Sequence, residues 1–286
     1  MSIDVIRTVA VLGAGTMGNG IAHVFARAGY KVILRDVEQR FLDRAMDTIH
    51  KNLDREVKKG KLDEAGKKSA LARLVPVTDL GAIAEADFAV EAVPEKLEIK
   101  RAVLGEASKL LREGVVLASN TSSIAMTALA AMTERPDRFV GMHFMNPVPV
   151  MQLVEVIRAL QTSDDAFNLT MDLSKKLGKT PVAVNDAPGF VSNRVLMPLI
   201  NEAAYCVMEG VAAPEAVDAV MKLGMNHPMG PLELADFIGL DVCVDILQVL
   251  HDGFGDPKYR ACPLLRKYVA AGWLGRKSGR GFYTYT

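Results

Sequence analysis

The sequence predicts an α/β fold in which a doubly wound sheet domain is followed by an all-helical C-terminal domain. Two observations predict this fold. Up to about residue 186, short apolar segments typical of strands alternate with segments of helical periodicity, which is the pattern of parallel strands joined by crossover helices. Beyond the DAPG segment at 186–189, almost every segment has helical periodicity. The chain of 286 residues is long enough for two domains of ordinary size, and we place their boundary at about residue 186.

The first domain begins with a short apolar segment that ends in glycines. A helical segment at 17–28 follows and stops at Gly29, which is a natural C-terminal cap. The charge-rich region 38–72 predicts a helical hairpin that turns near Gly60, and a further helix is expected over 95–111. The predicted strands are short apolar runs between turns, and they comprise residues 8–12, 31–34, 74–77, 88–93, 115–119, 139–142 and 153–157.

The second domain has an almost entirely helical pattern. Pro214 and Pro231 stand where a proline is tolerated in the first turn of a helix. The predicted helices of this domain span residues 190–210, 213–222, 231–252 and 263–271.

The charge balance argues against two classes of partner. The chain carries 34 basic and 34 acidic residues, so its formal net charge is zero. Proteins that bind nucleic acid or an anionic membrane surface usually carry a basic excess, so we expect neither partner. An anionic ligand would have to be held by a local arrangement of groups.

Cysteine and histidine spacing argues against a disulfide framework and against a metal site. Cys206, Cys243 and Cys262 form no CxxC pair and are odd in number, which fits a reducing compartment. The five histidines show no metal-ligand spacing, so no metal is expected. No apolar run approaches the roughly 20 residues of a membrane span, and a first strand near Thr8 leaves no room for a signal peptide. We therefore expect a cytoplasmic protein.

A glycine-rich segment between the first strand and the first helix predicts a dinucleotide site. The sequence VAVLGAGTMG at 9–18 contains GxGxxG. Gly13 permits a tight turn, Gly15 lets the backbone approach a pyrophosphate, and Gly18 lets the helix pack closely on the strand. The helix then directs its free N–H groups and the positive end of its dipole towards the phosphates. We expect Gly13, Gly15, Met17 and Gly18 to bind the cofactor in a Rossmann-like domain; the alternative is a glycine-rich turn without a ligand.

An acidic residue at the end of the second strand indicates which dinucleotide is bound. Asp36 follows the glycine segment by about 20 residues, where a carboxylate that binds the ribose hydroxyls is expected. A carboxylate would repel a 2′-phosphate, so Asp36 favours NAD. Arg35 would favour NADP, but successive strand residues point to opposite faces and we expect Arg35 to face away.

A histidine and a glutamate on two predicted strands form a candidate acid–base pair. His143 falls near the carboxyl end of a strand, where open α/β sheets bind ligands. After a proline-rich loop, Glu155 lies at the centre of the buried strand LVEVI, where an unpaired carboxylate would be costly. The pair suits alcohol oxidation, because the imidazole can accept the hydroxyl proton while the carboxylate orients the ring. The alternatives are a structural histidine and an edge-strand glutamate that faces water.

Segments along nearly the whole chain resemble the L-3-hydroxyacyl-CoA dehydrogenase family in its compact single-module form. The likeness is strongest to the bacterial 3-hydroxybutyryl-CoA dehydrogenases. The resemblance implies an NAD-dependent enzyme that interconverts (S)-3-hydroxyacyl-CoA and 3-oxoacyl-CoA in fatty-acid or butanoate metabolism. The segments are VAVLGAGTMGNGIA at 9–22, EAVPEKLEIK at 91–100, SNTSS at 119–123, HFMNPVPVMQLVEV at 143–156, DAPGFVSNR at 186–194, HPMGPLELADFIGLD at 227–241 and GRKSGRGFY at 275–283.

The resemblance also implies roles for individual residues. His143 corresponds to the catalytic base and Glu155 to its partner. Ser122 is similar to the serine that binds the substrate hydroxyl close to the nicotinamide, and Asn193 to the asparagine that holds the substrate from the start of the second domain. The other implied contacts are with the cofactor, at Glu95, Lys100, Asn146 and Lys277, and with the acyl-CoA, at Lys59 and at Asn52, where the family has a serine.

Four of these residues also have simpler interpretations. Ser122 could cap a helix, and Asn193 could lie on an exposed helix face. Lys277 could be an ordinary charge of the C-terminal segment. Lys59 belongs to the basic run 58–61, which is typical of a solvated turn.

We therefore expect an NAD-binding domain over residues 1–186 and a substrate-binding and dimerisation domain over residues 187–286, with the substrate in the cleft between them. The resemblance implies a homodimer through the helical domain. Two other functions stay open from the residues alone. One is a dehydrogenase of a free 3-hydroxy (sugar) acid. The other is a non-enzymatic NAD-binding module, which would need the glycines and Asp36 but not His143 and Glu155.

Overall fold

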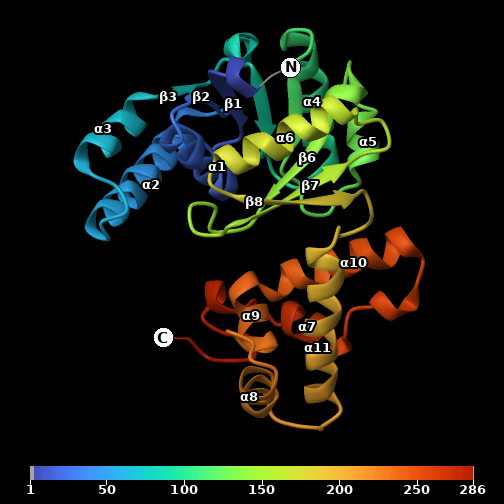
Figure 1. Ribbon diagram of the computed structural model, residues 1–286. Helices are drawn as coiled ribbons and strands as arrows, with labels where there is room; N and C mark the ends of the chain where they lie inside the picture. The colour runs from blue at the N-terminus through green and yellow to red at the C-terminus, as the bar shows by residue number, and fades with distance from the viewer. Residues whose placement is uncertain (1–2, 286) are drawn as a thin grey trace. The chain divides into compact units, whose positions relative to one another are not determined.

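The computed structural model describes residues 3–285, and the chain divides into two compact units, Met1–Asp186 and Ala187–Thr286 (Figure 1). Each unit contains a hydrophobic core cluster of its own. Within residues 3–285, no helix combines the length and the apolar character that a membrane crossing requires. The same stretch of chain contains no group of three or more side chains that could hold a metal ion.

The first unit is built on an eight-stranded sheet with the strand order β3-β2-β1-β4-β5-β6-β7-β8. This is the predicted doubly wound arrangement, in which the sheet grows in both directions from β1. All neighbouring strands are parallel except β6 and β7, because the short loop between them leaves no room for a crossover helix. The strands are β1 (Thr8–Leu12), β2 (Lys31–Arg35), β3 (Leu74–Val77), β4 (Phe88–Glu91), β5 (Val116–Ser119), β6 (Phe139–Phe144), β7 (Leu153–Arg158) and β8 (Thr180–Asn185).

One strand and two α-helices of this unit were not predicted, and the shorter of these helices is α5 (Met126–Ala130). Strand β8 is at the edge of the sheet and largely exposed, and it contains Pro181, so its sequence lacks the apolar run of a buried strand. Helix α6 (Asp164–Lys176) has a serine N-cap, since the side chain of Ser163 accepts a hydrogen bond from the backbone N–H of Ala166. Aspartates in its first turn and lysines in its last turn complement the helix dipole. These signals were present in the sequence.

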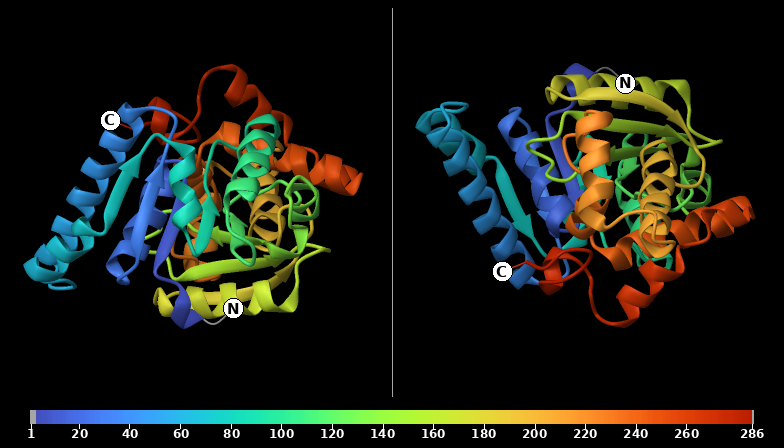
Figure 2. Two further views of the ribbon diagram at one scale, coloured as in Figure 1. Left: turned by 90° about the horizontal axis from the view of Figure 1, so that it is seen from above. Right: turned by 90° about the horizontal axis from the view of Figure 1, so that it is seen from below.

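The remaining helices of the first unit agree with the predicted ones. The hairpin of α2 and α3 turns at Gly60, which has a φ of 66°, and the two helices lie side by side (Figure 2). Helix α1 is followed by Gly29, which has a φ of 100°. The bounds are α1 (Thr16–Arg27), α2 (Gln39–Lys58), α3 (Glu64–Ala72) and α4 (Leu97–Leu110).

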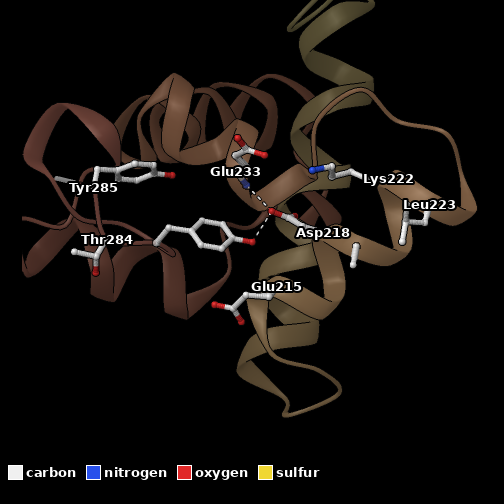
Figure 3. A pocket seen from close by; sticks show the side chains of 9 residues that line it. Glu215, Asp218, Lys222, Leu223, Glu233, Thr284 and Tyr285 are labelled. Atoms are coloured by element: carbon white, nitrogen blue, oxygen red, sulfur yellow. Dashed lines mark hydrogen bonds between the residues drawn. The ribbon is translucent and has the colours of Figure 1, made fainter.

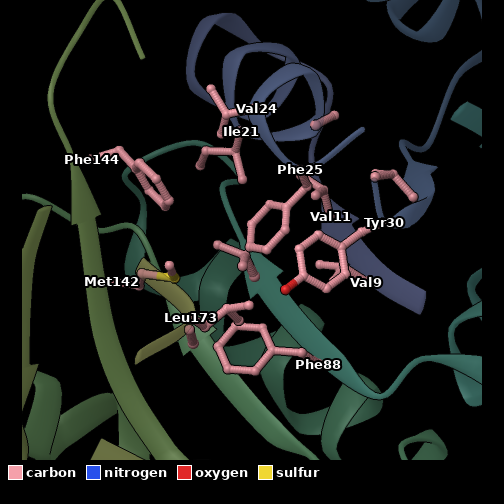
Figure 4. Close-up of a cluster of buried hydrophobic side chains, with 14 of the residues drawn as sticks. Val9, Val11, Ile21, Val24, Phe25, Tyr30, Phe88, Met142, Phe144 and Leu173 are labelled. Carbon is pink, nitrogen blue, oxygen red and sulfur yellow. The ribbon is translucent and has the colours of Figure 1, made fainter. Parts of the chain in front are cut away.

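The core of the first unit explains why its central strands are continuous apolar runs. Four of the five residues of β1 are buried, as expected for a parallel strand covered on both faces. Figure 4 shows the cluster on one face, where Val9 and Val11 meet Phe25 of α1, Phe88 of β4 and Leu173 of α6. This packing holds β1 and β4 in place, and candidate site residues follow the carboxyl ends of both strands.

The second unit consists of helices and short turns. Pro214 and Pro231 occupy first-turn positions, as predicted. The prediction of one helix over 231–252 is wrong, because Gly239 has a φ of 109°, a conformation that interrupts the helix. The helices are α7 (Ser192–Met208), α8 (Pro214–Gly224), α9 (Pro231–Ile238), α10 (Leu240–Phe254) and α11 (Pro263–Ala270).

Candidate active site

Most of the selected residues of the first unit gather at one edge of its sheet. Strands β1, β4, β5 and β6 are parallel neighbours, so their carboxyl ends share that edge. The glycine turn follows β1, Glu95 follows β4, the SNTSS segment follows β5, and His143 is the penultimate residue of β6. Strand β7 runs in the opposite direction and therefore starts at the same edge. The topology alone brings these segments together.

The turn after β1 requires glycine at two of its positions. Gly13 has a φ of 103°, and a Cβ there would lie 2.6 Å from the carbonyl oxygen of Ala92. A Cβ at Gly18 would lie 1.8 Å from the carbonyl oxygen of Gly13. Both contacts are closer than carbon and oxygen can approach. A side chain at Gly13 would push the turn away from the segment after β4, and one at Gly18 would push the start of α1 away from the turn.

The third glycine leaves open space beside the start of α1. A Cβ at Gly15 would meet no atom within 4 Å, and Gly15 is the N-cap of α1 without a side-chain cap. The turn lines a hollow together with residues of α2 and of the loop after β6, among them Arg44 and Asn146. The free N–H groups of a helix start beside open space suit a pyrophosphate. The side chain of Met17 packs against the core, so the part of Met17 suited to the cofactor is its backbone.

The carboxylate of Asp36 lies next to the glycine turn. Its Oδ2 accepts a hydrogen bond of 2.6 Å from the backbone N–H of Ala14, and its Oδ1 accepts one of 2.7 Å from that of Val37. The guanidinium of Arg35 donates instead to the carbonyl oxygen of Thr78 at 3.2 Å. A carboxylate without a neighbouring guanidinium partner suits ribose hydroxyls and disfavours a 2′-phosphate, so these residues fit NAD.

His143 and Glu155 are direct cross-strand partners in the register of β6 and β7. The Nδ1 atom of His143 lies 2.8 Å from Oε2 of Glu155, and the two residues are 7% and 2% exposed. Strand β7 lies between β6 and β8, so Glu155 does not lie on an edge strand facing water. The geometry is that of an imidazole supported by a buried carboxylate, which stabilises the protonated ring.

A buried lysine that the sequence analysis did not select holds the loop between β6 and β7. The ammonium group of Lys179 donates to the carbonyl oxygens of Val148 at 2.5 Å and Met151 at 2.7 Å. Burial, together with the positive charge of Arg27, lowers the pKa of Lys179. The same loop carries Asn146 to the hollow beside the glycine turn.

The SNTSS segment is anchored by the carboxylate of Glu95. Its Oε1 accepts hydrogen bonds from the hydroxyl of Thr121, from the backbone N–H groups of Ser122 and Ser123 at 3.0 and 3.2 Å, and from the Ser123 hydroxyl at 3.1 Å. Ser122 does not cap α5, because the N-cap of this helix is Ala125 and the backbone N–H groups of Met126 and Thr127 donate to the carboxylate of Asp186. Ser122 is therefore positioned through its backbone.

Lys100 does not lie at the surface of the site. Its side chain is 1% exposed, and its ammonium group contacts Glu91 Oε1 at 2.7 Å and Glu95 Oε2 at 3.2 Å. The resemblance implied a cofactor contact for Lys100, whereas the structure places it behind Glu95. Glu91 was not selected from the sequence, although the reasoning applied to Glu155, a carboxylate in a buried strand that needs a donor, applies equally to the strand FAVE.

The four residues implied to bind substrate or cofactor from other elements lie as follows. Asn52 lines the hollow beside the glycine turn, and its side-chain oxygen accepts a hydrogen bond of 3.0 Å from Arg55. Lys59 is exposed at the C-terminal end of α2. In the second unit, Asn193 is buried in the first turn of α7, and Lys277 forms an ion pair of 2.6 Å with Asp241. An exposed helix face is thereby excluded for Asn193.

A second hollow lies in the second unit, and Asp218 and Tyr283 in its lining are already hydrogen-bonded (Figure 3). Asp218 accepts hydrogen bonds from the backbone N–H groups of Leu232 at 2.8 Å and Glu233 at 2.9 Å, and from the hydroxyl of Tyr283 at 2.7 Å. Burial and the bond to Asp218 raise the pKa of Tyr283. These bonds fix the C-terminal segment on α8 and α9, and none of the selected site residues lines this hollow.

Two family descriptions together match almost the whole chain. Residues 8–187 match the NAD binding domain of 3-hydroxyacyl-CoA dehydrogenase, and residues 189–285 match its C-terminal domain.

Individual proteins match over similar lengths. A probable 3-hydroxybutyryl-CoA dehydrogenase of Deinococcus radiodurans is 57% identical over 275 residues, which are 96% of this chain and 99% of that protein. A 3-hydroxybutyryl-CoA dehydrogenase of Bradyrhizobium diazoefficiens is 54% identical over 281 residues, covering 98% and 96%. The crystal structure of an (S)-3-hydroxybutyryl-CoA dehydrogenase from Ralstonia eutropha gives a TM-score of 0.96 at 52% identity, covering 98% of this chain and 99% of that one.

Proposed function

Because the chain belongs to the 3-hydroxyacyl-CoA dehydrogenase family, whose cofactor is NAD, we propose that it interconverts (S)-3-hydroxybutyryl-CoA and acetoacetyl-CoA, with His143 and Glu155 as the acid–base pair. The observation that carries the proposal is the 2.8 Å contact between the two side chains at the sheet edge that also holds the glycine turn. The acyl group is taken from the names of the most similar proteins. A pure NAD-binding module has no need of this pair.

The glycine turn, the start of α1 and Asp36 are the groups that would hold NAD. The open space at Gly15 and the carboxylate beside the turn fit its diphosphate and its adenosine ribose. When bound, NAD supplies the acceptor for the hydride that leaves the 3-carbon of the hydroxyacyl group.

The proton of the substrate hydroxyl is transferred to a side chain of the protein. With Nδ1 of His143 donating to Glu155, the neutral ring carries its lone pair on Nε2, and Nε2 accepts the proton of the 3-hydroxyl. Glu155 stabilises the imidazolium that results, because the two charges meet in a buried environment. Ser122 and Asn193 bind the substrate in this proposal, and Asn52 and Lys59 contact its CoA part.

The test of the function is NADH oxidation with acetoacetyl-CoA, compared with longer 3-oxoacyl-CoA thioesters and with free acetoacetate and 3-oxo sugar acids. We expect rapid turnover of the short thioester and at least about a hundredfold lower kcat/KM with the free acids, which lack the binding energy of CoA. Faster turnover of a free acid would instead favour the dehydrogenase of free 3-hydroxy acids. No oxidation with any of them would contradict the proposal.

Replacing Asp36 tests the choice of cofactor. Asp36→Ala is expected to weaken NADH binding by about tenfold or more, because charged hydrogen bonds to the ribose contribute about 1.5–3 kcal/mol. NADPH binding is expected to change less, since the repulsion of its phosphate disappears as well. The dissociation constants are measured by NADH and NADPH fluorescence, with the exposed neighbour Glu38→Ala as the control. Equal weakening of both cofactors would show that Asp36 does not select between them.

We also propose a homodimer formed through the helical unit. Several apolar side chains of this unit are exposed, among them Val195 at 67%, Leu223 at 88% and Phe237 at 49%, whereas Ile200 and Leu240 lie in its core. Where exposed apolar side chains form a contiguous patch, they mark an interaction surface, and we propose that those of the helical unit meet the second subunit. Light scattering coupled to size exclusion is expected to give twice the chain mass of 31.0 kDa, and a monomer at all concentrations would contradict a dimer.

A further inference from the structure

We propose that Glu91 and Lys100 are positioning residues: these two buried residues and the partly exposed Glu95 form a carboxylate–ammonium–carboxylate chain that holds the SNTSS segment and thereby Ser122. The inference rests on the proposed function for the role of Ser122. It assigns a function to Glu91, and it gives Lys100 a role other than contact with the cofactor.

Glu91 connects two strands and one helix. It is the last residue of β4, is fully buried, and is the register partner of Ser119 on β5. Its Oε2 accepts a hydrogen bond of 2.6 Å from the Ser119 hydroxyl. Its Oε1 accepts bonds of 2.7 Å from the ammonium of Lys100 and from the backbone N–H of Val93. A buried carboxylate with three donors is firmly oriented.

Lys100 has an acceptor for each of its three ammonium protons. These acceptors are Glu91 Oε1 at 2.7 Å, Glu95 Oε2 at 3.2 Å and the carbonyl oxygen of Val93 at 3.4 Å. An ammonium group has three donors and no acceptor. In this arrangement all three protons of Lys100 point to acceptors of the protein, and Lys100 affects the site by holding Glu95 in place.

Glu95 transmits this arrangement to the SNTSS segment. One of its oxygens faces Lys100, and the other accepts the hydrogen bonds from Thr121, Ser122 and Ser123. Burial acts to raise the pKa of Glu95, but the Lys100 charge and the hydrogen bonds from Thr121 and Ser122 outweigh it and hold that pKa below its ordinary value. Glu95 therefore stays ionised at neutral pH, which its acceptor role requires.

The charges of Glu91, Lys100 and Glu95 predict which substitution displaces the SNTSS segment most. Removing the ammonium leaves the buried carboxylate of Glu91 and the partly exposed carboxylate of Glu95 without the cation between them, so the two like charges repel each other. Lys100→Met should therefore displace Glu95 and release the segment that it holds. Neutralising Glu91 in the same protein removes one of the two charges, so the double variant Glu91→Gln/Lys100→Met should recover part of the loss. A role of Lys100 in direct cofactor contact predicts no such recovery.

The first arm of the test measures the segment without substrate or cofactor. Hydrogen exchange of the backbone amides of residues 119–124 is expected to accelerate at least about tenfold in Lys100→Met and to slow again in the double variant. Ser119→Ala removes one bond of the chain and is expected to have a smaller effect of the same kind. Ser108→Ala is the matched control for Ser119→Ala. Ser108 is also buried and hydrogen-bonded, but it lies on α4 and its hydroxyl bonds the backbone of Gly105 and Glu134 rather than Glu91. Unchanged exchange in both Lys100→Met and Ser119→Ala would overturn the proposal.

The second arm separates positioning from cofactor contact. In Lys100→Met we expect kcat with acetoacetyl-CoA to fall about ten- to a hundredfold, since a small misplacement of a substrate-binding group is costly. The dissociation constant of NADH should change less than kcat does, and any loss of NADH affinity that comes from displacing Glu95 should be partly recovered in the double variant. A loss of NADH affinity as large as the loss of kcat, with no recovery in the double variant, would overturn the proposal in favour of direct contact. If Lys100→Met does not fold, the comparison of Ser119→Ala with Ser108→Ala replaces it in both arms.

If the wild-type protein does not reduce acetoacetyl-CoA, the proposed function fails. The hydrogen-exchange arm then still tests whether Glu91, Lys100 and Glu95 hold the SNTSS segment.

Discussion

Replacing His143 with glutamine is expected to lower kcat for NADH oxidation with acetoacetyl-CoA by about 10²–10⁴-fold. Glutamine has a similar volume and can still form a hydrogen bond with Glu155, but its amide neither accepts nor releases a proton at neutral pH. The range is that of general acid–base catalysis by one positioned side chain. Initial rates at saturating NADH and acetoacetyl-CoA measure the loss.

Two further measurements assign this loss to proton transfer. The dissociation constant of NADH should be unchanged within about threefold, because His143 does not line the hollow at the glycine turn. The control His251→Gln makes the same substitution at an exposed residue of α10 that bonds Asp252, and its kcat should equal that of the wild type. Near-normal turnover in His143→Gln would remove His143 from the mechanism.

Glu155→Gln is expected to lower kcat by about 10–100-fold while leaving the protein folded. The amide oxygen can still accept the Nδ1 proton of His143, so the tautomer of the ring is preserved and only the negative charge is lost. A hydrogen bond to a charged group contributes about 1.5–3 kcal/mol, and each 1.36 kcal/mol corresponds to about tenfold in rate. The missing charge destabilises the imidazolium, so the pH dependence of kcat should also change.

The control for this substitution is Glu85→Gln, which changes an exposed glutamate that pairs with Lys31. Its kcat and its pH profile should match those of the wild type. A Glu155→Gln variant with the rate and the pH profile of the wild type would show that the buried carboxylate has only a structural role. Thermal melting distinguishes loss of rate from loss of fold in both variants.

The parts of the site that could be predicted are those set by local chemistry. Gly13 and Gly18 could be predicted because a tight turn between a strand and a helix requires a positive φ at Gly13 and leaves no room for a Cβ at Gly18 beside the carbonyl oxygen of Gly13. His143 and Glu155 were readable because a short loop joins two strands, and a buried carboxylate needs a donor nearby. In both cases the partners are close in sequence or in adjacent elements.

The parts that escaped prediction depend on contacts between distant segments. Glu91 meets Ser119 only because β4 pairs with β5 in one register, and no local pattern encodes that register. Lys179 reaches the loop after β6 only because β8 closes the edge of the sheet, and β8 itself was not predicted. Gly239 was missed as a break because an isolated glycine within an apolar helical pattern is often tolerated.

The helices of the second unit were predicted better than the roles of its residues. Pro214 and Pro231 mark helix starts by their own chemistry. The roles of Asn193 and Lys277 depend on family resemblance, because an asparagine in a first helical turn and a lysine paired with Asp241 have no distinctive local signature.

The most direct test of the account is the turnover of the double variant His143→Gln/Glu155→Gln beside the two single variants. If Glu155 acts only by supporting the imidazole, removing its charge has no further effect once the imidazole is gone. The kcat of the double variant is therefore expected to equal that of His143→Gln within about threefold. A double variant that is slower than His143→Gln by the full factor measured for Glu155→Gln would contradict it, because the carboxylate would then act independently of the ring.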